Sequence, residues 1–428
     1  MTQASASVEK VVVNEKAFTL FLDKKFLLLW LTLLASSLSV SFFLFATNWY
    51  VVDYLGLEKM LGLVFFASSV PRLVFMLVGG VIADRMSKPW IMFISDVAKG
   101  VLLIGVIGLL FFDFLSIWTL IGLAFLFGIL DAFFWPASGS IIPSLVKTEQ
   151  LTRANSVLDM TRQASAMIGP LFAALLLGFG GYIGLFAFTA IFLLLAGGID
   201  LLIKNKMNKD AKETHVNEPQ PNVNQPKIFE SIKEGFAYVK TSPFLLSLMT
   251  TTIFLNLLFT GPLTVGMPLF AKNVLNGTEV TYSYLYGALA AGMLIGSLLI
   301  GVLNIQKKRG LVSVSAIMAL AIFFVLLSLS DVLAISLALV FLMGAAVAGA
   351  NIPLVSVIQQ HTESNYLGRV MSFVAFSSMG LVPISYLLTS LLISMNIPIN
   401  TIMLLSSSLL SCFILFVLIK AKSLREVD

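Results

Sequence analysis

The sequence predicts an all-α membrane protein with twelve transmembrane helices in two six-helix bundles. Of its 428 residues, 58% are hydrophobic and 11% are charged, whereas soluble domains average about 25% charged residues. Apolar stretches of about 20 residues, long enough to cross roughly 30 Å of hydrocarbon, recur from Phe26 to Lys420. Lipid cannot satisfy free backbone groups, so each stretch is expected to be a helix. Runs this continuous exclude the alternating strands of a barrel.

The expected helices fall into two groups of six, separated by one long polar connection. They occupy residues 26–52, 58–83, 90–112, 116–140, 153–178, 182–203, 244–271, 281–305, 311–330, 332–358, 367–393 and 397–419. The predicted organisation is a tail (1–25), a first bundle (26–203), a linker (204–243), a second bundle (244–419) and a short tail (420–428).

The linker is expected to contain two different segments. Residues 205–226 are polar and rich in Asn and Pro, a composition that predicts disorder. Residues 227–240 then place Ile228, Ile232 and Phe236 on one helical face. This pattern predicts a short amphipathic helix on the membrane surface, and a tether between the bundles is favoured over a regulatory role.

The basic residues are distributed unevenly about the predicted spans. Both tails and the even-numbered connections hold 22 of the 27 Lys and Arg residues, whereas the odd-numbered connections hold Lys59 and Lys272. By the positive-inside rule, both termini and the central linker are expected in the cytoplasm. The net charge of +5 is therefore a topology signal, and no nucleic-acid partner is expected.

Several classes of protein are excluded by what the spans lack. The single cysteine, Cys412, lies in the last span, so disulfides and cysteine-rich metal sites are not expected. Both histidines, His215 and His361, fall in connections, and no nucleophile–base spacing, metal-ligand spacing or Walker-type loop is present. The chain is therefore predicted not to be an enzyme and to need no cofactor. No cleaved signal peptide is expected either.

Six ionisable residues lie deep within the predicted spans of the first bundle, and a charged group in a membrane marks a candidate functional site. They are Arg72, Asp96, Lys99, Asp131, Asp159 and Arg162. At about 1.5 Å per residue from the cytoplasmic helix ends, four of them lie roughly 14 to 16 Å deep and Asp96 and Asp159 nearer 9 Å. The spacing of Asp96 with Lys99, and of Asp159 with Arg162, allows pairing within one helix, which is the plainer interpretation.

Asp131 has no opposite charge one turn away in its own helix. Its partner is therefore expected on another helix, where Arg162 and Arg72 lie at matching depth. One interpretation is a fixed ion pair between helices. The other is an acid that exchanges its cationic partner for a proton, as proton-coupled transport requires.

The second bundle has no acid inside its predicted spans. Its carboxylates, Glu279, Asp331, Glu363, Glu426 and Asp428, all fall in connections or in the tail. A substrate that is lipophilic, weakly charged or amphipathic is therefore expected, because a small dianion would favour an arginine clamp. Candidate polar groups in a substrate cavity are Asn48, Asn256 and Asn351, each of which helix packing would satisfy equally well.

The two halves share traces of a duplication. Leu151, Arg153 and Ser156 repeat the L-x-R-x-x-S pattern of Leu367, Arg369 and Ser372, at the start of the fifth helix of each half. Six-plus-six repeats about an axis along the membrane normal are the architecture of the major facilitator superfamily.

Three stretches carry a closer resemblance to that superfamily. The run GGVIADRMSK resembles its G-x-x-x-D-R-x-x-R/K motif between helices 2 and 3, with matches at Gly80, Asp84, Arg85 and Lys88. SAMIGPLFAA resembles the helix-5 motif of drug:proton antiporters, with matches at Gly169 and Pro170. Residues 130–158 and the Pro71-Arg72 pair are similar to the macrolide-efflux and enterobactin-exporter branch.

The resemblance implies a bacterial inner-membrane exporter that uses the proton gradient. It also implies a gate role for the first motif, in which Asp84 caps or pairs with the start of helix 11 near Arg369. The expected activity is export of a hydrophobic or amphipathic small molecule (a drug, macrolide or siderophore-like compound) in exchange for protons by alternating access. The expected partners are this substrate, protons and the lipid bilayer, with the monomer as the functional form. Alternatives are a proton-coupled symporter or lipid flippase of the same fold, and a transport-inactive membrane receptor.

Overall fold

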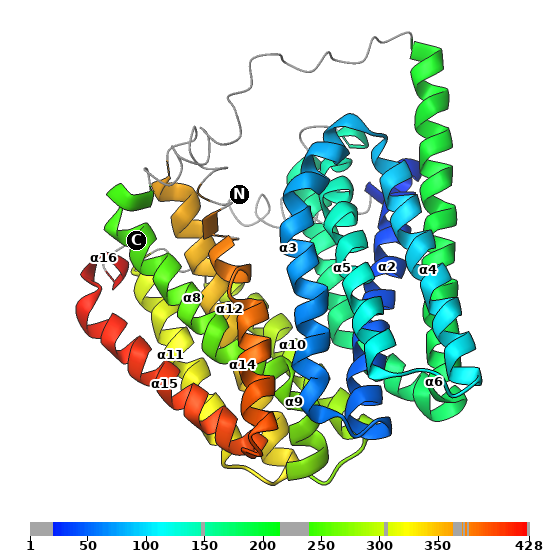
Figure 1. Cartoon of the computed structure of the whole chain (residues 1–428). Helices are drawn as coiled ribbons and strands as arrows, with labels where there is room; N and C mark the ends of the chain where they lie inside the picture. Colours follow the sequence, from blue (N-terminus) through cyan, green and yellow to red (C-terminus); the bar gives the residue numbers. More distant parts are fainter. Residues whose placement is uncertain are drawn as a thin grey trace, which may run out of the picture. The chain divides into compact units, whose positions relative to one another are not determined.

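The computed structural model describes residues 20–146, 150–214, 239–303, 307–362, 370, 373–374 and 376–425 (Figure 1). These residues form helices and their connections, without a strand. The α-helices are α2 (Lys24–Trp49), α3 (Leu61–Arg85), α4 (Lys88–Phe111), α5 (Ile117–Ser140), α6 (Leu151–Thr214), α8 (Pro243–Thr264), α9 (Gly266–Leu269), α10 (Glu279–Leu303), α11 (Arg309–Ser328), α12 (Leu333–His361), α14 (Val382–Ser394), α15 (Ile399–Lys420) and α16 (Lys422–Arg425). Short π-helical turns follow α2 (Tyr50–Tyr54) and α9 (Phe270–Val274), and 3-10 turns cover Glu58–Met60 and Ile142–Ser144.

Eleven of the helical segments in the described chain are long and apolar enough to cross a membrane. One of them covers 52 residues, Val157–Asn208, which at 1.5 Å per residue is roughly 78 Å, more than two bilayer cores. It lies in α6, which is interrupted at Gly181, where the backbone has a φ of 60° and a ψ of −166°. The predicted fifth and sixth spans therefore meet at a glycine with left-handed φ, which other residues rarely adopt. The prediction of an all-α, multi-pass membrane fold is confirmed.

Helix α6 also continues past the predicted end of the sixth span. The expected boundary was residue 203, but the helix runs on to Thr214. In Figure 1 this green end extends beyond the neighbouring helices of the amino-terminal half. The first part of the predicted polar linker is thus helical. Most of the predicted amphipathic helix, residues 227–240, lies within 215–238, which is outside the described part of the chain.

Two helix starts show how local sequence sets the boundaries. Before α5, the Oγ of Ser116 accepts the backbone N–H of Thr119, and the side chain of Thr119 binds the backbone N–H of Ser116 in return. Before α8, the Oγ of Ser242 accepts the backbone N–H of Leu245, and Pro243 opens the helix. Such caps satisfy amide groups that the first turn of a helix leaves without partners.

The chain divides into two compact units, the first of which combines Met1–Thr47 with Val70–Glu218. Within it, α4 packs against α5 and α6. The core of this unit is a cluster of buried side chains that includes Phe26, Met92, Phe134 and Ile203. These four residues come from α2, α4, α5 and α6, so one apolar core joins α2 to the helices that carry five of the six predicted charged residues.

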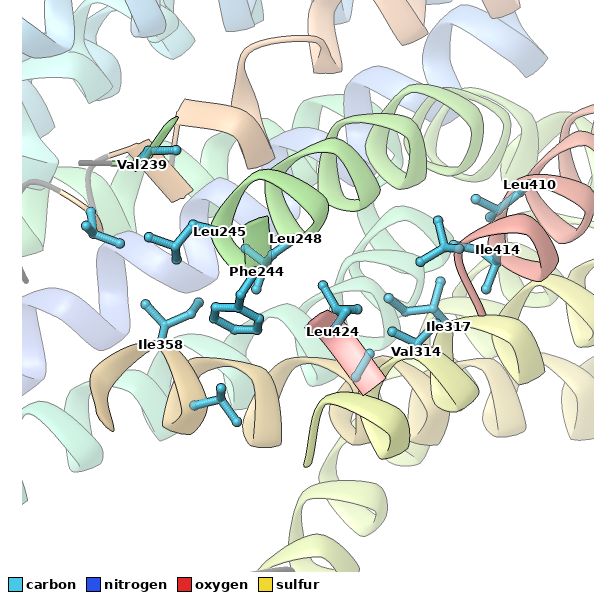
Figure 2. Packing of buried hydrophobic residues seen from close by; sticks show 14 of the residues in the cluster. Val239, Phe244, Leu245, Leu248, Val314, Ile317, Ile358, Leu410, Ile414 and Leu424 are labelled. Atoms are coloured by element: carbon cyan, nitrogen blue, oxygen red, sulfur yellow. The ribbon is translucent and has the colours of Figure 1, made fainter. Parts of the chain in front are cut away.

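The second unit combines Asn48–Ser69 with Pro219–Asp428. Its core, seen in Figure 2, is lined by side chains of α8, α11, α12, α15 and α16. The segment 48–69 belongs here because its polar groups bind this unit. The Nζ of Lys59 donates to Oδ1 of Asn396 at 2.9 Å. The backbone N–H of Gly62 donates to Oγ of Ser390 at 3.2 Å.

The second unit also contains a very close contact between α10 and α12. A Cβ placed on Gly292 would lie 1.9 Å from the carbonyl oxygen of Phe341, and one placed on Gly344 would lie 2.0 Å from that of Leu289. Small residues permit such an approach of helix backbones, which is a common way for membrane helices to associate. Glycine is therefore required at both positions.

Candidate functional site

The most deeply buried charges of the amino-terminal unit gather around Lys99 of α4. Its Nζ lies 2.5 Å from Oδ1 of Asp131 in α5 and 3.8 Å from Oδ1 of Asp96, one turn away in α4. The side chains of Lys99 and Asp96 are 1% and 0% exposed, and that of Asp131 is 14% exposed. A buried charge requires a partner, and the main partner of the Lys99 ammonium group is the carboxylate of Asp131.

Two hydroxyl groups of α2 complete the cluster. Thr32 and Ser36 are four residues apart and so lie on one face of the helix. The Oγ of Ser36 donates to Oδ2 of Asp96. The Oγ1 of Thr32 lies 2.9 Å from Oδ1 of Asp200 and 3.0 Å from the carbonyl oxygen of Ala196, both in α6. Four helices thus contribute polar groups to the cluster.

Asp200 is the residue of this cluster that the sequence analysis missed. Its side chain is 0% exposed, although it lies three residues before the expected end of its span. Since α6 continues to Thr214, Asp200 is not at a helix end. The available signal was an acid inside an apolar span, with hydroxyls one turn apart at positions 32 and 36 of another helix.

The structure corrects the expected partners of Asp131. An inter-helix partner is present, but it is Lys99 and not Arg162 or Arg72. Arg162 instead pairs with Asp159, as its i, i+3 spacing allows, and these side chains are 44% and 61% exposed. The guanidinium carbons of Arg72 and Arg162 lie 5.8 and 5.3 Å from the ring centroid of Trp135, within the range of cation–π attraction.

Five of the six predicted charges therefore fall into two groups, and the sixth, Arg72, lies near the ring of Trp135. Asp96, Lys99 and Asp131 form a buried cluster, whereas Asp159 and Arg162 form a more exposed pair. The expected pairing of Asp96 with Lys99 is present, but at 3.8 Å it is looser than the contact with Asp131. The buried group is the stronger candidate for proton chemistry, since exchange of a partner there changes the charge of a buried site.

Comparison with known proteins places this geometry in a family. The family model described as Major Facilitator Superfamily matches residues 29–386. The chain belongs to this superfamily. It is 26% identical to macrolide efflux protein A of Streptococcus pyogenes, over 94% of this chain and 97% of the relative. It is 27% identical to macrolide efflux protein A of Enterococcus faecalis, over 71% and 91%.

Solved structures agree on the fold of this superfamily member. A POT family transporter in complex with 5-aminolevulinic acid has a TM-score of 0.70 at 12% identity, covering 94% of this chain and 97% of that one. The resemblance to the macrolide-efflux branch is confirmed by the named relatives. The relatives and the fold are those of transporters, which also confirms that the chain is not an enzyme.

The superfamily motifs differ in how much of them is described. The predicted latch between Asp84 and Arg369 lies outside the described part of the structure, as do the surroundings of Gly80 and Arg85. Lys88 is described, and its Nζ donates to the carbonyl oxygen of Ser140 at the end of α5, at 3.0 Å. This contact ties the motif to α5.

The motif at Gly169 and Pro170, predicted for the fifth span and found in α6, marks a close contact between helices. A Cβ on Gly169 would lie 2.1 Å from Oγ and 2.5 Å from Cβ of Ser41 in α2. Pro170, the next residue, lies inside α6. The glycine is therefore needed for packing in this superfamily member, whatever further role the motif has.

The three candidate cavity asparagines have different surroundings. Asn48 is buried and donates to the hydroxyl of Tyr282 at 2.8 Å. Asn256 donates to the carbonyl oxygen of Thr252 and accepts from Thr260, both in its own helix. Asn351 is exposed on α12. Asn256 is thus satisfied by helix packing, the alternative that the sequence left open, whereas Asn48 is satisfied only in part, because its buried Oδ1 has no hydrogen-bond partner among the described residues.

Proposed function

We propose that this protein exports hydrophobic or amphipathic small molecules in exchange for protons, by alternating access. The observation that carries the proposal is the buried cluster of Asp96, Lys99 and Asp131 in the amino-terminal unit. Intramembrane acids with a cationic partner are typical of proton pathways in transporters. A proton bound to Asp131 would remove the negative charge that attracts Lys99, and the ammonium group would then move toward Asp96. Protonation of the cluster and the position of Lys99 are therefore linked.

The proton gradient is a sufficient source of energy for such a cycle. Each charge that moves across 100 mV contributes about 2.3 kcal/mol, and each pH unit contributes about 1.4 kcal/mol per proton. One proton per cycle thus supports a tenfold to hundredfold substrate gradient or more. No bound cofactor is included in the proposal, and the monomer is the proposed working unit.

The proposed substrate class follows from the charges of the second unit and from the relatives. In its described residues, the one buried charged side chain is Arg309, at the first residue of α11. Such surroundings favour apolar or amphipathic compounds over small multiply charged ones. Macrolides are the first class to test, since two relatives are named macrolide efflux protein A. We propose the bacterial inner membrane as its location, because its relatives are bacterial, and both termini in the cytoplasm, because of the distribution of its basic residues.

The direction and the coupling ion are tested together in proteoliposomes with an imposed pH gradient. We expect added substrate to move protons in the direction opposite to its own movement. Movement of both in the same direction would replace exchange by symport, and movement of substrate without protons would remove proton coupling. A screen of macrolides, dyes and siderophores in cells with and without the gene, read as growth inhibition and accumulation, identifies the compound to use.

A further inference from the structure

Asp200 has an unusual hydrogen-bonding environment for an ionised acid. It is fully buried, and its Oδ2 has no hydrogen-bond partner among the described residues. Among the described residues, its Oδ1 has one hydrogen-bond partner, the hydroxyl of Thr32 at 2.9 Å. An ionised carboxylate has about four acceptor positions to satisfy, and burying one without donors is very costly. The surroundings of Asp200 therefore favour the neutral acid.

The proton count at Thr32 supports the same conclusion. Its hydroxyl lies within hydrogen-bonding distance of two oxygens, Oδ1 of Asp200 and the carbonyl oxygen of Ala196 at 3.0 Å. A hydroxyl has one proton to donate but also accepts through its lone pairs. If Thr32 donates to the carbonyl of Ala196, the contact with Asp200 becomes a hydrogen bond only when Asp200 is protonated and donates. Both short contacts are then satisfied at once.

The charges around Asp200 give a third, independent reason. Asp200 and Asp96 bind hydroxyls one turn apart on α2, Thr32 and Ser36, and Lys99 lies beside Asp96. Asp131 of α5 takes the closest contact of Lys99, and α2 presents only the hydroxyls of Thr32 and Ser36. Lys204, one turn further along α6, has its Nζ over the ring of Trp90, 3.8 Å from the centroid, so the three carboxyl groups share the ammonium group of Lys99. With all three ionised, the cluster would have an uncompensated charge of −2 in a buried site, which requires bound protons.

We propose that Asp200 is a proton-binding site of the transport cycle, and that it holds its proton in the arrangement seen here. The proposal rests on the proposed function, because it assigns the exchanged proton to a particular residue. On release, the O–H bond of Asp200 breaks, the proton passes to water and the electron pair remains on the carboxylate. The counter-ion of the ionised Asp200 is then Lys99. Its ammonium group is released when another carboxyl group of the cluster, Asp96 or Asp131, carries a proton.

The protonation state can be measured without transport. Infrared difference spectra of the purified full-length protein, recorded on changing pH, detect the C=O stretch of a buried carboxylic acid. We expect such a band in the wild type and in Asp113→Asn, a matched change at an exposed turn residue with a φ of 56°. The band should lose intensity in Asp200→Asn. An unchanged band in Asp200→Asn, or none in the wild type, would overturn the proposal.

A second variant guards against misfolding of Asp200→Asn. Thr32→Val keeps the acid but removes its hydroxyl partner, so the band should remain and move to higher frequency as the hydrogen bond is lost. A band that does not move would show that the acid detected is not Asp200. Asn matches the neutral acid in shape and also donates, so a folded Asp200→Asn protein is itself expected. Aggregation of both variants, with Asp113→Asn folded, would indicate an ionised carboxylate at position 200 and contradict the proposal.

Transport assays separate this proposal from the proposed function. For Asp200→Asn in proteoliposomes, we expect accumulation driven by one pH unit to fall about tenfold, the contribution of one coupled proton. Substrate exchange without a gradient should persist. Wild-type accumulation in the variant would overturn the role of Asp200 while the exporter stands. If the wild type moves no protons, proton exchange itself fails, and a band that persists would leave Asp200 as a structural acid only.

Discussion

The two units of this transporter bury different kinds of groups. The first buries Asp96, Lys99 and Asp200 within one cluster, whereas the described part of the second buries a single charged residue, Arg309, at a helix end. The second unit instead brings the backbones of α10 and α12 into contact through Gly292 and Gly344. A close glycine contact is also present in the first unit, at Gly169 against Ser41, so what sets the first unit apart is its buried charge cluster.

The difference suggests a division of labour. A buried charge cluster changes its preferred arrangement when a proton binds, since one protonation alters every pairwise interaction within it. Close glycine contacts between helices do not respond to pH and have few alternative packings. Energy coupling is therefore expected in the amino-terminal unit, and the carboxyl-terminal unit is expected to be insensitive to protonation in its core.

The largest effect is expected from Lys99→Met. Removal of one partner from a buried ion pair leaves the other charge uncompensated and costs about 3–5 kcal/mol. We expect a lower apparent unfolding temperature in detergent and loss of gradient-driven export. The control is Lys420→Met, at the exposed end of α15. Equal unfolding temperatures for the two variants would show that Lys99 does not neutralise the cluster.

Asp131→Asn is expected to affect transport more than folding. The amide keeps the size of the side chain, and the ammonium of Lys99 retains Asp96 at 3.8 Å. Gradient-driven export should fall sharply while the protein still inserts and binds substrate, measured as accumulation against binding in the same preparation. Unchanged active transport would remove Asp131 from the mechanism.

Steric dependence of the second unit is tested by Gly292→Ala. The new Cβ would lie 1.9 Å from the carbonyl oxygen of Phe341, so α10 and α12 must separate, at a typical overpacking cost of about 1–3 kcal/mol. Gly301→Ala in the same helix is the matched control, because a Cβ there meets nothing within 4 Å. Thermal unfolding should distinguish the two variants, and the difference should not depend on pH. A pH-dependent difference would break the contrast between the units.

The smallest effect is expected from Asp84→Asn. In the predicted latch, Asp84 caps or pairs with the start of the eleventh predicted span (367–393) near Arg369. Loss of this contact should slow transport without loss of folded protein, because the latch forms in only one state of the cycle. Transport rate and the monodisperse yield on size-exclusion chromatography measure the two properties. Full activity would argue against the latch.

Much of the fold was predictable because hydropathy acts locally along the chain. The positions of the spans, and the superfamily itself through Gly80, Asp84, Gly169 and Pro170, follow from the order of residues. The break between the fifth and sixth spans lies at Gly181, between the predicted ends at 178 and 182, whereas the continuation of α6 to Thr214 was not predicted. That continuation depends on where a helix stops, which a polar composition indicates only loosely, since polar residues are also helical outside the membrane.

The candidate site was predicted in part. Its sequence signal was six charges in apolar spans, and three of them, Asp96, Lys99 and Asp131, do lie together. Depth along the helix axis suggested Arg162 and Arg72 as partners of Asp131, but depth alone says nothing of the direction in which a side chain points. Asp200 was missed because its burial depends on the packing of α2, α4 and α6.

By itself, the sequence determined that this chain is a helical membrane transporter, and in which half its acids lie, because transfer free energies of side chains into lipid are set residue by residue. Only the tertiary structure decided which acid meets which base. Helix rotation and tilt are determined by the packing of neighbouring helices, and a rotation of one residue, about 100°, turns Lys99 away from Asp131. The same packing encloses Asp200 with Thr32.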